Sequence, residues 1–219
     1  MYTEDDVMEM YRNSLKMDDT FNFECKMCGN CCRKRKEPII ISGLDAFYIA
    51  KALDMEMPAL FNKILNVEVG YTSKMPTAYL QERLDGSCRL LRNGKCMVQD
   101  NKPIVCRLYP IGRLFNGKEF IYFSQHSSCG DKNKTITIRE WLKSFNIPED
   151  DIEGKTYMKV FGEATLYMQT LKKETDKQEF YKDLFLAFFI QYDIEKSFLE
   201  NFNENKDFLY KKYPKMRLE

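Results

Sequence analysis

Four cysteines lie within eight residues near the start of the chain, in the run C-K-M-C-G-N-C-C. They are Cys25, Cys28, Cys31 and Cys32. A buried cysteine needs only a small apolar space, so packing alone gives no reason for four thiols to cluster. In a reducing compartment such a cluster is typical of a metal site. We therefore expect the fold to be organised around a metal held by this segment and by ligands from elsewhere.

A disulfide framework is the alternative to a metal site. The first residues are acidic and amphipathic, and they lack the basic and apolar regions of a secretion signal. No stretch approaches the ~18 apolar residues of a membrane span. Cys31 and Cys32 are adjacent, which strains a direct bridge between them. We therefore expect a cytoplasmic protein whose thiols are free to bind metal.

The composition is that of a folded protein with little net charge. Hydrophobic residues make up 44% of the 219 residues and aromatic residues 14%, which fits a globular protein. The net charge of +1 argues against a protein that coats nucleic acid. Charge is locally uneven, since residues 26–36 carry five basic residues and no acid. Cations near clustered thiolates would lower their pKa, although an ordinary solvated basic face is the alternative interpretation.

Hydrophobic periodicity predicts helices near both ends of the chain. The predicted helices cover residues 3–16, 42–53, 58–65, 138–145, 150–172, 177–192 and 195–213. Ser42 is a suitable N-cap for the second of these helices. The aromatic residues of the last three repeat at helical spacing, which indicates core positions rather than chemistry.

Short extended segments separated by turns occupy the middle of the chain. They are residues 38–41, 77–83, 88–91, 95–98, 111–115 and 119–124. Asn93-Gly94 and Asn116-Gly117 are strong two-residue hairpin signals. The sequence therefore predicts an α+β fold, mainly helical, with a small antiparallel hairpin region that carries the cysteine metal site. We expect one compact domain over residues 1–219, with a metal-binding core at 21–130 and a helical region at 137–219.

All eight cysteines are candidate metal ligands, as two four-ligand sites or as one site with additional structural thiols. The remaining four are Cys88, Cys96, Cys106 and Cys129. Zinc sites typically combine two C-x2-C pairs, or one pair with histidines, but the second half has no such pair and His126 is the only histidine. The C-x2-C-x2-C spacing at the start of the run matches iron–sulfur loops that take a fourth ligand from elsewhere. This favours an iron–sulfur cluster, with Zn²⁺ as the alternative and His126 as a further candidate ligand.

Three sequence blocks carry a resemblance to a known family. They are C-K-M-C-G-N-C-C-R at 25–33, G-S-C-R-L-L-R-N-G-K-C-M-V at 86–98 and K-P-I-V-C-R-L-Y-P at 102–110. With these motifs, residues 21–130 resemble the CxxCxxCC family, the YkgJ-like group, whose members are described as zinc- or iron-chelating proteins. Lys102 stands where the family often has arginine, which keeps the charge but loses the bidentate fork.

The resemblance implies a bound metal without naming a reaction. A distant relative, the flagellin lysine N-methylase, shares the cysteine block and is associated with a [4Fe–4S] cluster and methyl transfer. This chain is shorter than that architecture requires, so the resemblance implies the cluster and not the activity. The helical region at 137–219 resembles no family that we recognise.

Two functions follow as hypotheses. In the first, the chain is an iron–sulfur-dependent transferase or oxidoreductase that acts on a protein substrate or partner. Arg33 and Arg107 would then tune the charge of the centre and Tyr109 would line it, although Arg107, Tyr109 and Pro110 could equally serve only to hold the cysteine loop. In the second, zinc stabilises a protein-interaction module without catalysis. No paired carboxylates, phosphate-binding loop or Ser/His/Asp arrangement supports hydrolytic chemistry.

Overall fold

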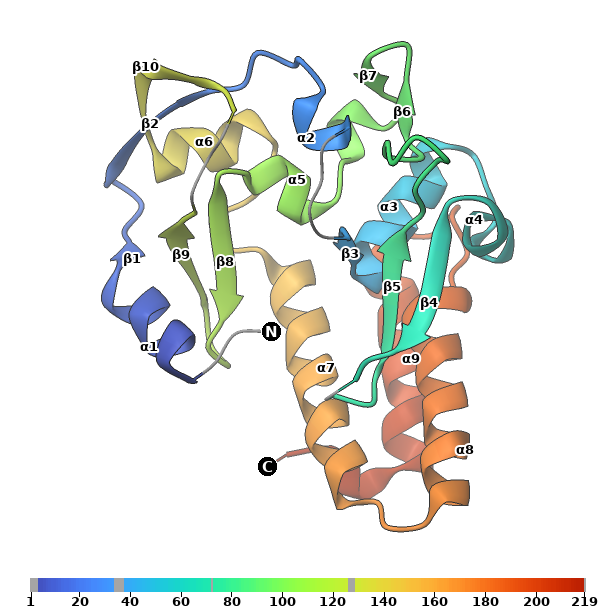
Figure 1. The fold of residues 1–219 in the computed structure, drawn as a ribbon. Coiled ribbons are helices and arrows are strands. Elements are labelled where there is room, and N and C mark those ends of the chain that lie inside the picture. Colours follow the sequence, from blue (N-terminus) through green and yellow to red (C-terminus); the bar gives the residue numbers. More distant parts are fainter. Residues whose placement is uncertain (1–3, 34–37, 72, 126–128, 219) are drawn as a thin grey trace.

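Two hydrophobic cores, built from different stretches of the chain, organise the fold (Figure 1). The computed structural model describes residues 4–33, 38–71, 73–125 and 129–218. Helix α5 (Ile104–Leu108) lies between the two cores in Figure 1, close to the cysteine run. The core around Trp141 contains Leu108, the last residue of α5, and Ile104, the first residue of this helix, packs against the same core. Both ends of α5 are therefore anchored there.

The smaller core packs around Trp141. The rings of Phe21 and Phe23 meet the indole edge-on, with centroids 5.6 and 5.5 Å away, and its Nε1 donates a 2.9 Å hydrogen bond to the carbonyl of Leu108. A satisfied indole N–H is what a buried tryptophan requires. The elements around it are α1 (Glu4–Arg12), β1 (Ser14–Leu15), β2 (Thr20–Glu24), β8 (Ile111–Phe115), β9 (Phe120–Ser124), β10 (Asp131–Thr137) and α6 (Ile138–Ser144).

Antiparallel pairing joins these strands. Three of them form a sheet of order β1-β9-β8, and β10 and β2 form a separate two-stranded sheet. The pairing of β2 with β10 joins the segment just before the cysteine run to the segment just after Cys129. The two ends of the cysteine-rich part are therefore held side by side.

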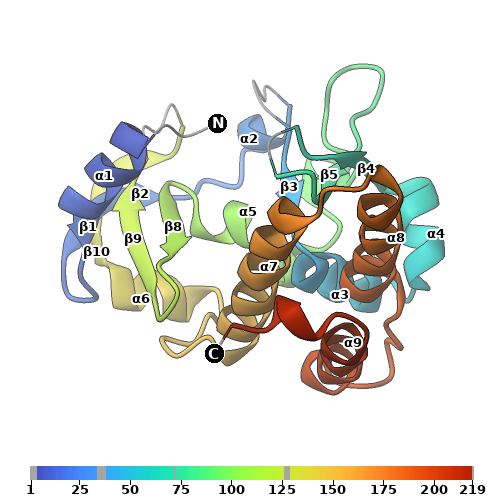
Figure 2. The ribbon, with the colours of Figure 1, turned by 90° about the horizontal axis from the view of Figure 1, so that it is seen from below.

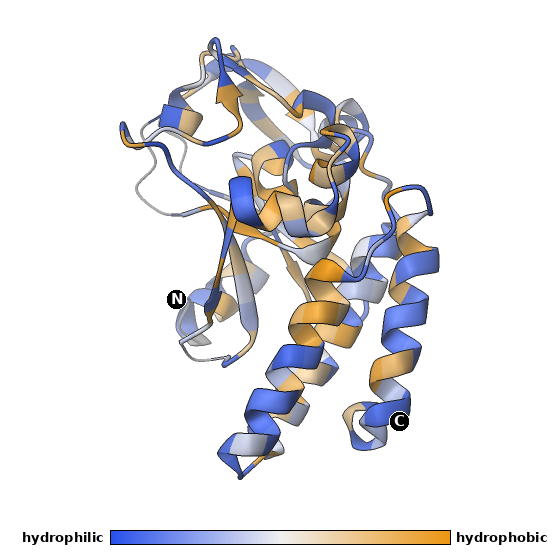
Figure 3. Cartoon of the chain, turned by 90° about the vertical axis from the view of Figure 1, so that its right-hand side faces the viewer, coloured by the Kyte–Doolittle hydropathy of each residue, from blue (hydrophilic) through white to orange (hydrophobic). Residues whose placement is uncertain are grey.

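The larger core lies under a second antiparallel sheet and the C-terminal helices. The strands have the order β3-β5-β4. They are β3 (Ile40–Ile41), β4 (Leu65–Val69) and β5 (Pro76–Leu80), and the helices are α3 (Gly43–Ala52), α4 (Met57–Lys63), α7 (Ile152–Thr170), α8 (Glu174–Phe185) and α9 (Phe198–Lys212). Figure 2 shows α7, α8 and α9 gathered on one side, away from α1. Colouring by hydropathy shows hydrophobic and hydrophilic residues alternating along these helices (Figure 3), as expected for helices with one buried face.

Capping boxes decide where three helices begin. Ser42, Thr137 and Ser197 each accept a hydrogen bond from the backbone of the residue three positions later. The acidic side chain at that third position accepts a hydrogen bond from the backbone N–H of the cap residue. Two otherwise unsatisfied N–H groups are thereby paired at each helix start. In the described part of the chain no helix is both long and apolar enough to cross a bilayer.

Many of the predicted elements are confirmed. The structure has α3 after its Ser42 cap, α6, α7 and α9 close to their predicted bounds. It also has hairpins at Asn93-Gly94, between β6 (Leu91–Arg92) and β7 (Lys95–Cys96), and at Asn116-Gly117. The α+β class is confirmed as well. The helix predicted for 177–192 is split, because α8 passes into a π-helical turn at Leu186–Ile190.

Other predictions are wrong in ways that long-range pairing explains. The first helix ends at Arg12, because Ser14 and Leu15 pair with Phe123 and Tyr122 of β9. Residues 88–91 are not a strand of their own. Strands β2, β4 and β10 and helix α5 were not predicted. Strands β2 and β10 pair with each other across more than a hundred residues, which local periodicity does not reveal, whereas β4 pairs with the neighbouring strand β5.

Gly43 provides a test of how closely α3 approaches the π-helical turn. A Cβ at this position would lie 1.8 Å from the carbonyl oxygen of Phe188, so a side chain would force the backbones apart. We expect Gly43→Ala to reduce the free energy of unfolding by about 1–3 kcal/mol. In contrast, a Cβ at Gly162 inside α7 meets nothing within 4 Å. We expect Gly162→Ala to raise the free energy of unfolding by about 0.5–1 kcal/mol. Urea unfolding of both variants measures the difference, and equal effects would contradict the close approach.

Candidate metal centre

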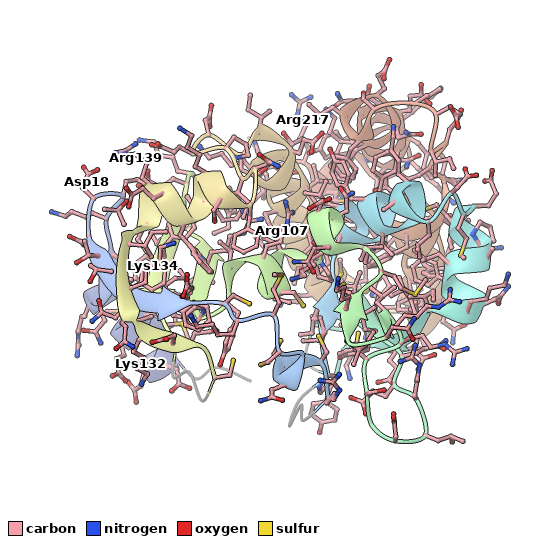
Figure 4. All side chains as sticks on the ribbon, turned by 90° about the horizontal axis from the view of Figure 1, so that it is seen from above. Asp18, Arg107, Lys132, Lys134, Arg139 and Arg217 are labelled. Atoms are coloured by element: carbon pink, nitrogen blue, oxygen red, sulfur yellow. The ribbon has the colours of Figure 1, made fainter. Side chains whose placement is uncertain are left out.

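Six of the eight cysteines line one cavity of about 420 Å³ at the end of the molecule where α2 (Asn30–Arg33) lies. They are Cys25, Cys28, Cys31, Cys32, Cys96 and Cys129. Figure 4 looks down on this end, and several sulfur atoms lie around α2. Thiols from three separate stretches of the sequence are therefore brought to one place.

The cysteine run is shaped by backbone contacts rather than by a long helix. The N–H of Cys32 bonds to the carbonyl of Gly29, which closes the turn that enters α2. Arg33 donates from Nη1 to the carbonyl of Cys28 at 2.8 Å. Arg33 thus fixes the turn of the loop at Cys28, a role that the sequence analysis did not predict for it.

Gly130 lets the end of the cysteine-rich part approach β2. Its φ is +82°, and a Cβ would lie 2.2 Å from the ring of Phe23. A side chain would be excluded both by the backbone conformation and by the aromatic ring. Cys129 is thereby placed next to the strand that leads into Cys25.

Cys88 and Cys106 lie outside the lining of the cavity but close to it. Cys88 is only 7% exposed, and its N–H donates a 2.7 Å hydrogen bond to the carbonyl of Cys32. Cys106 lies on α5, where both Cys88 and Cys31 act on it electrostatically. Cys96 lies on β7, in register with Leu91 of β6. The two remaining thiols therefore adjoin the cavity from the core side.

Electrostatic contacts link the thiols into two overlapping groups, since Cys31 also acts on Cys96 and Cys106. The pKa of Cys129 is raised first by burial and then by Cys31, Cys28 and Cys25, while a hydrogen bond with Tyr109 lowers it. Cys32 interacts instead with Cys88, Cys106 and Cys96. The Sγ atoms of Cys31 and Cys32 are 3.9 Å apart, so these adjacent residues connect the groups.

Burial is the main cause of the raised pKa of Cys96, Cys106 and Cys129. A hydrogen bond to Cys32, followed by burial, raises the pKa of Cys31, and burial raises that of Cys106 to about 12. Cys32 has a lowered pKa, because it accepts the hydrogen bond from Cys31. Lys102 acts in the direction predicted for the basic neighbours, lowering the pKa of Cys31 and Cys96, but burial outweighs it for Cys96. Several thiolates here would require a further positive charge, which a metal ion supplies.

The donor set suits a thiophilic metal. All eight cysteines lie in the described part of the chain, and they carry thiol groups rather than disulfides. Thiolate sulfur is the preferred ligand of zinc and of iron–sulfur clusters. Among the described residues, no group of three or more cysteine, histidine, aspartate or glutamate side chains is arranged to hold a metal as it stands. Since metal–sulfur bonds are about 2.3 Å long, coordination would require these side chains to turn towards a common point.

The remaining predicted site residues have different positions. The ring of Tyr109 meets that of Phe23 edge-on at 5.9 Å, next to Cys129. Arg107 does not line the cysteine cavity but a second cavity beyond α5. His126, which was a candidate ligand, lies outside the described residues.

Other residues line the cysteine cavity without having been predicted as site residues. Among them are Met27, Gln99 and Lys102. The Gln99 amide lies 3.9 Å from the sulfur of Met27, so two distant segments meet at the rim. Lys102 could have been found, because it opens the sequence block that contains Cys106.

Comparison with known proteins gives one match. Residues 24–130 match the family model CxxCxxCC, described as a "putative zinc- or iron-chelating domain". The match begins one residue before Cys25 and ends one residue after Cys129, so it contains all eight cysteines. No curated protein and no solved structure matches the chain. Residues 24–130 of this chain are thus similar to the CxxCxxCC family, and the resemblance covers just under half of the chain.

Proposed function

We propose that this protein chelates an iron–sulfur cluster through its clustered cysteines and works in the cytoplasm as a redox or group-transfer enzyme. The observation that carries the proposal is the single cavity lined by the whole cysteine run together with Cys96 and Cys129. Metal chelation itself agrees with the family that residues 24–130 resemble.

The two electrostatic groups suggest how the ligands are shared. Cys25, Cys28, Cys31 and Cys129 would hold the cluster, because the first three have the C-x2-C-x2-C spacing and Cys129 is the remote thiol that interacts with all of them. When bound, such a cluster supplies one-electron transfer. Cys32, Cys88, Cys96 and Cys106 would form a second set of ligands on the core side.

The surrounding residues would position the ligands and admit a substrate. Arg33 holds the carbonyl of Cys28 in place, and the hydrogen bond of Tyr109 with Cys129 favours the thiolate of that residue. Lys102 places a positive charge at the wall of the cavity. The 420 Å³ of space beside the thiols can receive part of a substrate, including a side chain of a protein.

A zinc-stabilised interaction module is the second candidate. The hydrogen bond between Cys88 and Cys32 already joins the two halves of the cysteine-rich part, and zinc on the second set of ligands would strengthen that junction. Leu84 and Tyr71 are fully or largely exposed and could contact a protein partner. In this case the metal would contribute folding energy and no chemistry.

Metal analysis of protein purified without oxygen separates the two candidates. We expect stoichiometric iron and acid-labile sulfide, with visible absorption from charge transfer between thiolate and iron, and bleaching on exposure to air. A colourless protein with stoichiometric zinc that is unchanged by air would contradict the iron–sulfur proposal and support the interaction module. A protein without either metal would contradict both.

A further inference from the structure

A second cavity of about 470 Å³ lies on the far side of the segment that carries Cys106. The segment 99–108 separates the two cavities. Gln99 and Lys102 line the cysteine cavity, whereas Asn101 and Arg107 line the second one. Figure 4 shows Arg107 in the middle of the molecule, between α6 and α3. This second cavity has no cysteine in its lining, so it is separate from the proposed metal centre.

Arg107 brings an incompletely bonded guanidinium to this cavity. Its Nε is buried and has no hydrogen-bond partner among the described residues. Leaving a buried donor unsatisfied is costly, more so when the group is charged. Arg113, the other arginine of the lining, differs because it forms a 2.7 Å ion pair with Asp151 and lies over the ring of Phe120. Of the two arginines in this lining, Arg107 is therefore the one with an unsatisfied donor and with no ion pair among the described residues.

Two of the carboxylates that line this cavity with Arg107, Asp45 and Asp151, already have other partners. Asp45 accepts from the N–H of Ile104 at 2.7 Å and from Ser42, which fixes it as a helix cap. Asp151 accepts from Arg113 and from the N–H of Gly154. These acids act on Arg107 through space and keep its charge from being isolated. Among the described residues, none of these acids forms a direct ion pair with its N–H groups.

A pair of polar side chains supplies a second recognition element. The hydroxyl of Tyr48 donates to Oε2 of Glu153 at 2.7 Å, and both residues line the same cavity. Glu153 and Arg107 are close enough to interact electrostatically. A ligand on Arg107 could therefore present a hydroxyl or amine to this pair.

We propose that this cavity binds a small organic acid, with its carboxylate on Arg107 and a hydroxyl or amine beside Tyr48 and Glu153. A planar guanidinium matches a carboxylate in a two-bond geometry. A carboxylate is favoured over a phosphate because Asp45, Asp151 and Glu153 would repel a doubly charged anion more strongly. The volume suits a molecule of metabolite size.

Nitrogen-15 NMR of the Arg107 side chain tests this site directly. The probes are acetate, glycine and inorganic phosphate, added to the metal-containing protein at constant ionic strength. We expect a saturable shift of the Arg107 Nε resonance with acetate, a shift at lower concentration with glycine, and the weakest effect with phosphate. The resonance is assigned by its loss in Arg107→Lys. No saturable shift, the same shift with chloride, or the strongest response to phosphate would overturn the proposal.

Variants separate binding at this cavity from metal binding. Arg107→Lys keeps the positive charge but cannot make two parallel hydrogen bonds to a carboxylate. We expect the dissociation constant of glycine, measured by calorimetry, to rise about tenfold. Arg139→Lys, an exposed arginine on α6 that pairs with Asp18, is the matched control and should bind normally. Tyr48→Phe should remove the advantage of glycine over acetate, which tests the site even if Arg107→Lys does not fold. Metal content should be unchanged in all three. Unaltered glycine binding in both Arg107→Lys and Tyr48→Phe would overturn the proposal.

Discussion

Replacing Cys28 with serine is expected to remove most of the bound metal. A serine hydroxyl is a hard donor that stays protonated at neutral pH, so it replaces a thiolate poorly at a thiophilic centre. Changes to residues that merely support a ligand already weaken metal affinity by about 10–100-fold, and loss of the ligand itself should cost no less. Metal per chain, measured on anaerobically purified protein, should fall at least about tenfold.

Three further variants show whether the loss is specific. Cys129→Ser should lose the same metal to the same extent, because it is proposed to complete the group of Cys25, Cys28 and Cys31. Cys106→Ser should instead reduce only metal bound by the second set. Met27→Leu changes a sulfur-containing residue of the same cavity wall, 68% exposed, and should leave the metal content as it is. Unchanged metal in Cys28→Ser would show that the proposed ligand set is wrong.

Removing the ring of Phe188 is expected to give the largest loss of stability. Its side chain is 1% exposed, and its ring meets those of Tyr157, Phe161 and Phe202 edge-on at 5.2, 5.8 and 5.7 Å. Phe188→Ala therefore leaves a cavity where α7, α9 and the π-helical turn meet. The free energy of unfolding should fall by about 3–5 kcal/mol, a large part of the ~5–15 kcal/mol of a typical domain.

The matched control for this variant is Phe208→Ala on α9. Phe208 is 45% exposed, so its truncation should cost less than about 1 kcal/mol. Urea unfolding followed by circular dichroism measures both changes. Because Cys88 belongs to the same core as Phe188, Phe188→Ala should also make metal easier to remove with a chelator. Equal losses of stability in the two variants would contradict the assignment of Phe188 to the centre of this core.

Local sequence signals were sufficient wherever a few neighbouring residues determine the structure. Ser42 and Asp45 form a capping box within one helical turn, and Asn93-Gly94 forms a hairpin between strands of two residues. The strand β2 lacked any such signal, since it exists through pairing with β10, which begins more than a hundred residues later. Contacts of this range depend on the whole chain, so periodicity could not reveal them.

The sequence by itself determined that the chain carries eight thiols in family motifs, and hence the kind of metal it can chelate, because ligand softness is a property of the residue type. The tertiary structure decided which thiols adjoin one another. It paired β2 with β10, so that Cys129 lies near Cys25, and it turned α5 so that Cys106 adjoins the other thiols while Arg107 lines a second cavity. Consecutive helical residues point about 100° apart, which places Cys106 on the side of the thiols and Arg107 in a cavity without them.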